Sequence, residues 1–171
     1  MPRPVSPAQR GVLEVDWTLF GELCRGLALR VARDYQPDVV LGIAKAGVIP
    51  GAVISSILQC EFASMTVTRE AGADEPVLIS GPPRTIAGAR VLIVDETCDT
   101  GHTMKRALSE VRGMHPAEVR TAVSIKTGTF MPDFHSFETE KLIILPWDRE
   151  IIVAGELVTR PDYAKWLEAA G

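Results

Sequence analysis

The amino-acid sequence predicts an α/β fold built on an open, mainly parallel twisted sheet flanked by helices. Two runs of mostly branched apolar residues, 39–43 and 91–94, have the composition of strands buried on both faces of a parallel sheet. Each run is followed by a segment with helical features, and alternation of strands with helices is typical of parallel sheets. With 171 residues, the chain is long enough for one domain with a substantial core, 1–171.

The first expected elements are a helix, a strand, a second helix and a second strand. Asp16 is placed to cap a helix that runs to about Tyr35, since leucine and valine recur there at every fourth position. The strand at 39–43 leads into a helix at 49–58, which has a proline in its first turn, where proline is tolerated. Polar and apolar side chains alternate over 62–68, as expected of a half-exposed strand.

The next segment, 69–88, is rich in glycine and proline and has weak periodicity, apart from three apolar residues at 77–79. This composition predicts a mobile hairpin or a long loop. Beyond it we expect the strand at 91–94, which ends where the acidic residues begin, and a helix that starts near Met104. The remaining expected elements are a strand at 120–126, a polar loop, a strand at 142–145 and a short helix after Pro161.

Charge and cysteine content limit the class of protein. The formal net charge of −4 and the isoelectric point near 5.4 argue against a nucleic-acid partner. Three widely separated cysteines without CxxC spacing favour reduced thiols in a cytoplasmic protein over a disulfide framework or a zinc site. The longest apolar stretch, 39–58, is interrupted by a lysine and a proline, so no membrane partner is expected. We expect a cytoplasmic homodimer or larger homo-oligomer.

Three acidic residues, Asp95, Glu96 and Asp99, lie within five positions directly after the strand at 91–94. Carboxylates held together repel one another unless a cation or a hydrogen-bond donor compensates them. The helix that follows offers free backbone N–H groups to an anion, and the carboxylates offer oxygens to a hard cation or to sugar hydroxyls. Asp99 alone could simply cap the helix, but capping does not explain the adjacent pair. The turn therefore suits a ligand that carries phosphate, a polyol and a metal ion.

Residues 91–103 resemble the 5-phosphoribosyl 1-pyrophosphate (PRPP) signature of the type I phosphoribosyltransferases: four apolar residues, two acids, two variable positions and Asp-Thr-Gly-x-Thr. The resemblance implies that Asp95 and Glu96 hold the ribose hydroxyls, directly or through Mg²⁺, and are therefore the expected metal ligands. It implies that Asp99 is the catalytic general base toward the purine. The residues implied to bind the ribose and 5′-phosphate of PRPP are Asp95, Glu96, Asp99, Thr100, Gly101, His102 and Thr103.

Residues 44–51 resemble the pyrophosphate loop of the 6-oxopurine phosphoribosyltransferases, in which a basic residue precedes two small ones and a Pro-Gly-Ala helix start follows. By that resemblance, Lys45, Ala46 and Gly47 bind pyrophosphate. Alanine stands at position 46 where glycine is usual in the family. The family often has a cis peptide bond in this loop, and whether the Lys45–Ala46 bond is cis is left open.

The segment 69–85 matches in chain order the flexible hood of the family. Such a hood is needed because water would capture a ribosyl cation in an open site. Arg69 and Arg84 either meet pyrophosphate when the loop closes or are ordinary surface residues, and the sequence leaves both alternatives open.

Two further segments resemble the base-binding region of the family. Lys126 corresponds in order to the lysine that reads the 6-oxo group of the purine, and its N–H donors suit a carbonyl acceptor rather than the amino group of adenine. Residues 142–148 resemble the base-binding segment of bacterial xanthine–guanine phosphoribosyltransferases, which also ends in Pro-Trp-Asp. The implied base-binding residues are therefore Lys126, Leu142, Ile143 and Trp147, with Leu142 standing where that relative places an aromatic ring.

The resemblance implies the type I phosphoribosyltransferase fold, with a flexible hood loop and a small base-binding subregion. It further implies a Mg²⁺-dependent purine-salvage enzyme that joins a 6-oxopurine to PRPP, forming a nucleoside monophosphate and releasing pyrophosphate. The sequence does not choose among hypoxanthine, guanine and xanthine. Two alternatives stay open: a regulator that uses this fold to sense PRPP or nucleotides, and a transferase for uracil, orotate or adenine.

Overall fold

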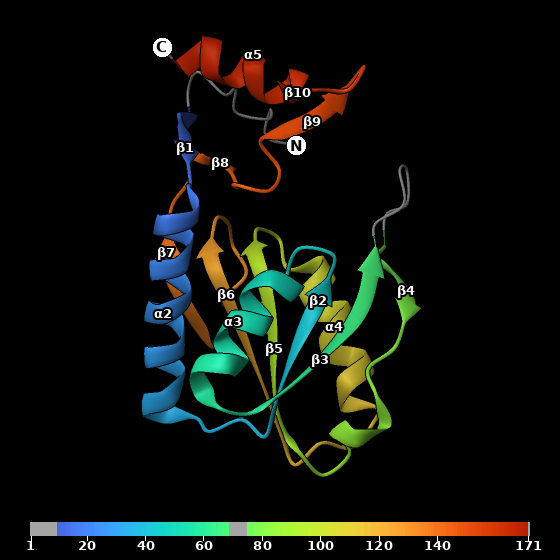
Figure 1. Ribbon diagram of the computed structural model, residues 1–171. Helices are drawn as coiled ribbons and strands as arrows, with labels where there is room; N and C mark the ends of the chain where they lie inside the picture. Colours follow the sequence, from blue (N-terminus) through green and yellow to red (C-terminus); the bar gives the residue numbers. More distant parts are fainter. Residues whose placement is uncertain (1–9, 69–74, 171) are drawn as a thin grey trace. The chain divides into compact units, whose positions relative to one another are not determined.

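The computed structural model describes residues 10–68 and 75–170 (Figure 1). The chain divides into two compact units, one formed by residues 22–139 and the other by residues 1–21 together with 140–171. A single domain over 1–171 remains a prediction. No helix among the described residues combines the length and the apolar composition needed to cross a membrane.

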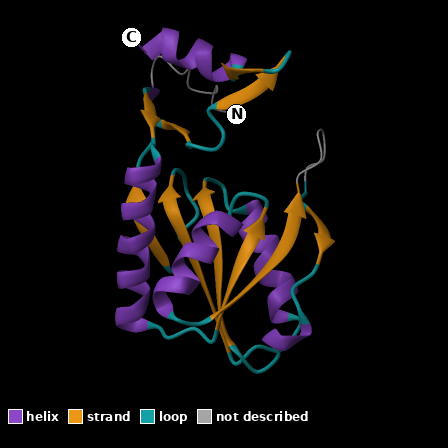
Figure 2. Cartoon of the chain, in the orientation of Figure 1, coloured by secondary structure: helices purple, strands orange, loops and turns teal. Residues whose placement is uncertain are grey.

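The larger unit is built on a six-stranded sheet with the strand order β4-β3-β2-β5-β6-β7 (Figure 2). Five of its strands are parallel, and β4 at one edge runs antiparallel to β3. This arrangement confirms the predicted open, mainly parallel sheet. The strands are β2 (Val39–Ala44), β3 (Glu61–Thr68), β4 (Val77–Ser80), β5 (Arg90–Cys98), β6 (Glu118–Lys126) and β7 (Phe134–Glu138), and the helical elements are α2 (Trp17–Asp34), α3 (Val48–Leu58), η1 (Arg84–Ile86) and α4 (His102–Arg112).

The two faces of the sheet are covered by different helices because side chains on a strand alternate between faces. On one face, Leu41 and Ile43 of β2 share an apolar cluster with Met104 of α4. On the other face, Gly42 lets α3 approach closely, since a Cβ there would lie 3.0 Å from the Cα of Val48. Figure 1 shows α3 and α4 on opposite sides of the central strands.

The central strand β5 extends further than the sequence predicts. The expected strand ends at Val94, whereas the observed one continues to Cys98 and so contains the first two acidic residues. The prediction was wrong because β6 continues to Lys126 and supplies backbone partners for the additional residues, with Asp95 opposite Val123 and Cys98 opposite Lys126. Pairing with a neighbouring strand thus outweighs the polar character of the segment.

Two other elements of the larger unit differ from expectation. The loop after β6 contains β7, a strand that the sequence analysis missed because its residues Phe134–Glu138 are largely polar and lack clean alternation. At the opposite edge, part of the segment 69–88, predicted to be a hairpin or a long loop, forms β4, which pairs antiparallel with the preceding strand β3. Residues 69–74, which include Arg69, lie outside the described residues, so the predicted mobility of that part is not tested.

The smaller unit has its own sheets. Strand β1 (Val12–Glu14) pairs in parallel with β8 (Leu142–Ile144), and β9 (Glu150–Val153) pairs antiparallel with β10 (Glu156–Thr159). Of these four strands, only β8 was predicted. Its partner is β1 and not the six-stranded sheet, because β1 offers a free edge within the same unit. The expected C-terminal helix is confirmed as α5 (Pro161–Ala170).

Helix α2 begins in the smaller unit and continues into the larger one. Its predicted cap is present, since the Leu19 backbone N–H donates to Asp16 Oδ1 at 2.7 Å. In the smaller unit, the ring of Trp147 packs edge-on against Phe20 with centroids 4.7 Å apart, and against Trp17 at 5.6 Å. These rings fix the segment that follows β8.

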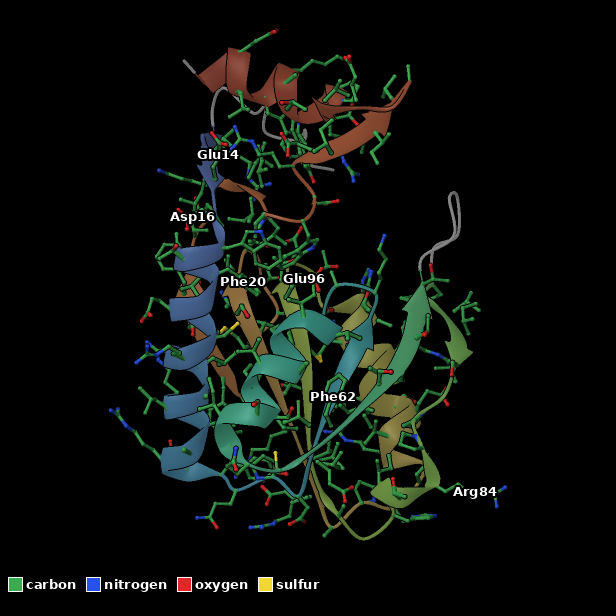
Figure 3. All side chains as sticks on the ribbon, in the orientation of Figure 1. Glu14, Asp16, Phe20, Phe62, Arg84 and Glu96 are labelled. Carbon is green, nitrogen blue, oxygen red and sulfur yellow. The ribbon has the colours of Figure 1, made fainter. Side chains whose placement is uncertain are left out.

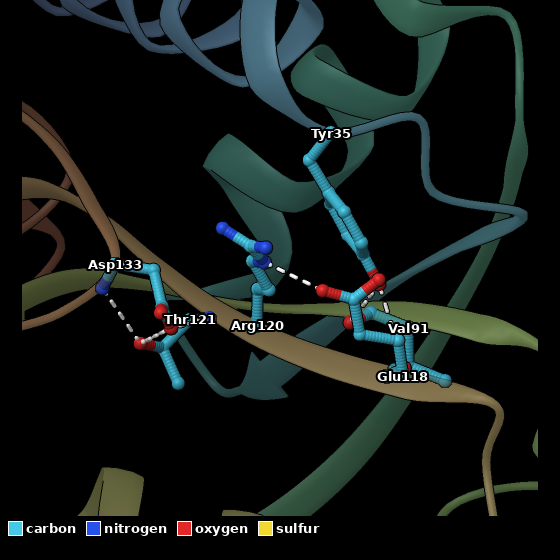
Figure 4. Close-up of polar contacts among 6 residues, drawn as sticks. All are labelled: Tyr35, Val91, Glu118, Arg120, Thr121 and Asp133. Carbon is cyan, nitrogen blue, oxygen red and sulfur yellow. Dashed lines mark hydrogen bonds and ion pairs between the residues drawn. The ribbon is translucent and has the colours of Figure 1, made fainter.

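The amino-terminal edge of the six-stranded sheet is joined by a polar network (Figure 4). The single O–H of Tyr35 donates to the carbonyl oxygen of Val91 at 3.1 Å and shares its proton with that of Glu118 at 3.4 Å, on the adjacent strand. The Arg120 guanidinium lies 5.3 Å from the centroid of the Tyr35 ring and donates to the Glu118 carboxylate at 2.8 Å. Burial, followed by the nearby Glu118 carboxylate, raises the pKa of Tyr35. The protonated hydroxyl therefore links β5 to β6.

Replacing Tyr35 with phenylalanine should lower the free energy of unfolding by about 1 kcal/mol at neutral pH, the usual net value of a hydrogen bond. The wild-type protein should lose stability as the pH rises above about 10, because the unfolded chain then releases the Tyr35 proton more readily than the folded one. Y35F should lack that part of the loss. Urea titrations between pH 8 and 10.5 measure both effects.

Tyr163, whose pKa burial raises to about 12, contributes a further alkaline loss that both proteins share. The informative quantity is therefore the difference between the two slopes of unfolding free energy against pH. Parallel slopes for wild type and Y35F would show that Tyr35 is not the group responsible.

Candidate active site

The acidic turn lies at the carboxyl end of β5, where α4 begins. Gly101 makes the turn with φ +76°, a left-handed conformation that favours glycine, and helix α4 starts at the next residue. Residues 95–104 line a cavity of about 250 Å³. Figure 3 shows Glu96 at this end of the strand. The turn thus combines carboxylate oxygens with the unpaired N–H groups of a helix start, as the sequence predicts.

The adjacent carboxylates are crowded and under-satisfied. Asp95 Oδ1 accepts the Glu96 backbone N–H at 3.0 Å. Glu96 Oε2 is buried and has no hydrogen-bond partner among the described residues. Burial and the neighbouring Glu96 carboxyl raise the pKa of Asp95 well above its usual range. A buried oxygen without a donor costs free energy, so the pair suits a ligand that brings hydroxyl donors or a cation.

The chemistry of this pair fits a hard divalent cation, which prefers carboxylate oxygens. No group of three or more His, Cys, Asp or Glu side chains with metal-binding geometry occurs in residues 10–68 and 75–170. Asp95 and Glu96 could therefore supply at most part of a coordination shell, and oxygens of a bound ligand or water would have to complete it.

The predicted pyrophosphate loop lies beside the same carboxylates. A cavity of about 290 Å³ is lined by Lys45 and Ala46 together with Asp95, Glu96 and Thr103. Gly47 packs directly on the acidic residue, since a Cβ at position 47 would lie 2.7 Å from Asp95 Oδ1. The structure therefore brings the 45–47 loop and the acidic turn together. The cis peptide bond in this loop joins Ala44 to Lys45, one bond earlier than the position left open from the sequence.

Asp99 is exposed at the mouth of the turn. The first part of the predicted polar loop after β6 packs against it, a contact that the sequence analysis did not foresee. The Phe130 backbone N–H donates to the Asp99 carbonyl oxygen at 3.1 Å, and a Cβ at Gly128 would lie 1.9 Å from Asp99 Oδ1. The Phe130 ring in turn covers Gly101, where a Cβ would lie 2.3 Å from it. Glycine soon after a strand end signals a close backbone approach, and Gly128 follows β6 in this way.

Cys98 lies within the turn but has no chemical role that the geometry supports. Its side chain is buried, and burial, followed by the Asp95 and Asp99 carboxylates, raises the pKa of the thiol to about 12. Its carbonyl oxygen accepts the Thr127 backbone N–H at 2.9 Å. A neutral thiol is a poor nucleophile and metal ligand, so Cys98 acts as packing.

The predicted base-binding residues are divided between the two units. Lys126 ends β6 in the larger unit and is buried, with its ammonium paired to Glu138. Leu142 and Ile143 lie half-buried on β8 of the smaller unit, and Trp147 follows them in its aromatic cluster. That these residues meet at one base remains a prediction.

Arg84 lies far from the acidic turn. It is exposed on η1, which precedes β5 in the chain. In Figure 3, Arg84 and Glu96 lie at opposite ends of the sheet. Of the two alternatives left open for this residue, the structure therefore favours the surface one.

Replacing Gly47 with alanine should lower the free energy of unfolding by more than about 2 kcal/mol, as overpacking of a rigid site does. The added Cβ would lie 2.6–2.8 Å from three oxygens, two of them main-chain carbonyls that cannot move alone. Gly21→Ala is the matched control, because nothing lies within 4 Å of its Cβ position in α2. That change should stabilise by up to about 1 kcal/mol through helix propensity. Thermal unfolding of both variants measures the contrast, and equal midpoints would contradict the close approach at position 47.

Several proteins of known name are related to this chain in sequence. The relatives include a xanthine phosphoribosyltransferase of Saccharomyces cerevisiae, 27% identical over 129 residues, which are 61% of this chain and 62% of the yeast protein. A xanthine-guanine phosphoribosyltransferase of Nitratidesulfovibrio vulgaris is 26% identical over 89% of this chain and 94% of its own. An adenine phosphoribosyltransferase of an Arthrobacter strain is 34% identical over 61% of this chain and 52% of its own. The chain thus spans less than two thirds of the yeast and Arthrobacter relatives.

A solved structure, that of a purine phosphoribosyltransferase from Pyrococcus horikoshii, superposes with a TM-score of 0.75 at 28% identity. The match covers 85% of this chain and 99% of the archaeal one. The family profile described as the phosphoribosyl transferase domain matches residues 15–158, which include the 45–47 loop, the acidic turn and residues 142–148. On this match, and on the fold that carries the turn, the chain belongs to the phosphoribosyl transferase domain family.

Proposed function

We propose that this protein is a Mg²⁺-dependent purine-salvage phosphoribosyltransferase. It joins a 6-oxopurine to PRPP and forms a nucleoside monophosphate and pyrophosphate. The observation that carries the proposal is the acidic turn, where two crowded carboxylates, one with a buried unpaired oxygen, lie beside the start of helix α4. A ligand that satisfies all of these groups needs a phosphate for the N–H groups of the helix, and ribose hydroxyls and a bound cation for the carboxylates.

Each end of PRPP has residues suited to it. Backbone N–H groups of 100–103 and the hydroxyls of Thr100 and Thr103 bind the 5′-phosphate at the start of α4. Asp95 and Glu96 bind the ribose hydroxyls and hold Mg²⁺, which when bound supplies positive charge to the departing pyrophosphate. Lys45, Ala46 and Gly47 bind the pyrophosphate through an ammonium and backbone N–H groups.

Bond exchange at the ribose then requires charge stabilisation and one proton transfer. As the bond to pyrophosphate breaks, positive charge develops on the ribosyl carbon, and the nearby carboxylates stabilise it. The purine nitrogen attacks that carbon, and Asp99 accepts the proton that the purine loses. Its exposure at the mouth of the turn supports this role, because the carboxylate can reach a base that enters from solvent.

For base recognition the proposal assigns Lys126 in the larger unit and, by the resemblance, Leu142, Ile143 and Trp147 in the smaller unit. An ammonium donates to a 6-oxo group, whereas the amino group of adenine would present a donor to a donor. The relative named adenine phosphoribosyltransferase keeps a second candidate open, a transferase for adenine, and the buried ammonium of Lys126 argues against it.

We also propose that the protein acts in the cytoplasm as a homodimer or larger homo-oligomer, on small molecules and not on nucleic acid or membranes. Cys24, Cys60 and Cys98 are all free thiols, which supports a reducing compartment.

The proposal is tested by initial rates with PRPP, Mg²⁺ and each free base in turn. Hypoxanthine, guanine or xanthine should react at least roughly 10²-fold faster in kcat/KM than adenine, a conservative value for a site that would leave a buried donor unpaired. Lys126→Met should reduce this ratio mainly by slowing the oxopurine. Comparable rates for adenine and hypoxanthine would refute the role of Lys126, and turnover of no base would favour a regulator that only senses PRPP or nucleotides.

Asp99→Asn should leave PRPP binding within a few-fold and lower kcat by roughly 10²-fold or more, the usual range for loss of a general base. The amide keeps the size of the side chain but cannot accept the purine proton. Steady-state kinetics with the preferred base measure the effect, and an unchanged kcat would remove Asp99 from the mechanism.

Replacing Asp95 and Glu96 together by asparagine and glutamine should weaken PRPP binding by at least roughly 10-fold while leaving the affinity for free base nearly unchanged. The amides lose the charge that holds Mg²⁺ and the acceptors for the ribose hydroxyls. Calorimetry with and without Mg²⁺ separates the two contributions. Wild-type affinity for PRPP in the double variant is incompatible with the ribose assignment.

A further inference from the structure

A buried cation and an exposed anion form an ion pair at the carboxyl end of the six-stranded sheet. The Lys126 side chain is 6% exposed, and its ammonium donates to Glu138 Oε1, whose side chain is 57% exposed. Glu138 is the one acidic side chain within 4.0 Å of this ammonium in the part of the chain that the structure describes. The buried charge of Lys126 is therefore balanced from the solvent side by a single carboxylate.

Strand pairing accounts for this geometry. Cys98, Lys126 and Glu138 stand opposite one another on β5, β6 and β7, so their side chains emerge from one row of the sheet. Opposite residues on neighbouring strands point to the same face and lie within side-chain reach. The Thr139 backbone N–H donates to the Lys126 carbonyl oxygen at 3.0 Å and closes the row just after Glu138.

The carboxylate of Glu138 also faces an imidazole. His135 Nε2 lies 3.8 Å from Glu138 Oε2, on the same strand. The hydrogen bond from Lys126 lowers the pKa of Glu138, with smaller contributions from the Lys126 and His135 charges. Glu138 therefore stays ionised at neutral pH and can hold Lys126 throughout the range in which the enzyme would act.

An ammonium has three N–H donors and free rotation about its last bond, so a single fixed acceptor restricts where the other two donors point. A buried ammonium without a counter-charge would also be costly. From this arrangement we infer that Glu138 is a positioning residue for base recognition: it holds the Lys126 ammonium so that a second N–H meets the 6-oxo group. The inference rests on the proposed function, in which Lys126 reads the purine.

The test compares steady-state kinetics of the full-length protein carrying Glu138→Gln with those of the wild type, using hypoxanthine, guanine and xanthine. The KM for each oxopurine should rise roughly 5- to 20-fold, while kcat and the KM for PRPP stay within about two-fold. This is the pattern expected when binding is lost equally from ground and transition states. Glu138→Asp keeps the charge on a shorter side chain, so it should restore part of the affinity that Glu138→Gln loses.

Glu118→Gln is the matched control. It removes the same charge from the opposite end of β6, where Glu118 is bonded to Arg120 of the same strand with both side chains partly exposed. The control should leave all kinetic constants within about two-fold, because Glu118 lies at the amino-terminal edge of the sheet.

The remaining outcomes each decide against the inference in a distinguishable way. A raised KM for guanine alone would mean that Glu138 contacts the 2-amino group of the base directly. A matching loss of kcat, PRPP affinity and melting temperature, without recovery in Glu138→Asp, would mean a purely structural role. An unchanged KM in Glu138→Gln together with a raised KM in Lys126→Met would refute positioning but leave the proposed function intact. Failure of the unmodified protein to use any purine would overturn both.

Discussion

The pairing of β5 with β6 over the whole length of both strands is the constraint on which the candidate site depends. It begins at Arg90 opposite Glu118 and ends at Cys98 opposite Lys126, beyond the apolar part of β5. A hydrogen bond stabilises each end of the pairing. At the amino-terminal end the Tyr35 hydroxyl donates to the Val91 carbonyl, and at the carboxyl end the Thr127 backbone N–H donates to the Cys98 carbonyl. Both strands continue as far as the pair Cys98 and Lys126. The acidic turn, the loop after β6 and the Lys126 side chain therefore lie at the same edge of the sheet.

At the carboxyl edge of the sheet, the groups proposed to bind ligand lower the stability of the folded protein. Burial of Asp95 beside Glu96 raises the pKa of Asp95, and Glu96 Oε2 has no hydrogen-bond partner among the residues that the structure describes, so folding places these two groups in an unfavourable environment. Gly47 adds to this crowding, because it brings main chain close to Asp95 Oδ1 where a larger residue would collide. Gly128 makes a similar close approach to Asp99 Oδ1. A ligand with a cation and hydroxyls relieves the crowding, so the same groups that weaken the free protein strengthen binding.

The sequence predicted the parts of this arrangement that are carried by local patterns. Branched apolar runs identified β2 and β5, apolar residues at every fourth position identified α2, and the thirteen-residue motif located the turn. Features that depend on a partner distant in sequence were missed. The polar end of β5 is a strand because β6 pairs with it, and β7 is a strand for the same reason. Strand β1 is three residues long and exists through its pairing with β8, which no local pattern reports.

The missed strand β7 also bears on the role in base recognition that is proposed for Lys126. From sequence, Lys126 is a lone lysine at a strand end, with solvent as its default environment. Its burial follows from its position on an inner strand between β5 and β7, and its counter-charge comes from β7, the element that local patterns could not reveal. Had the segment after β6 been a polar loop, as predicted, the ammonium would have no fixed partner and no fixed direction. To discriminate a carbonyl from an amino group, the donor needs both a fixed partner and a fixed direction. A fixed N–H then meets an acceptor in a 6-oxopurine and is left unpaired when the base presents an amino group. Edge-strand pairing therefore links the architecture of the sheet to the proposed choice of base.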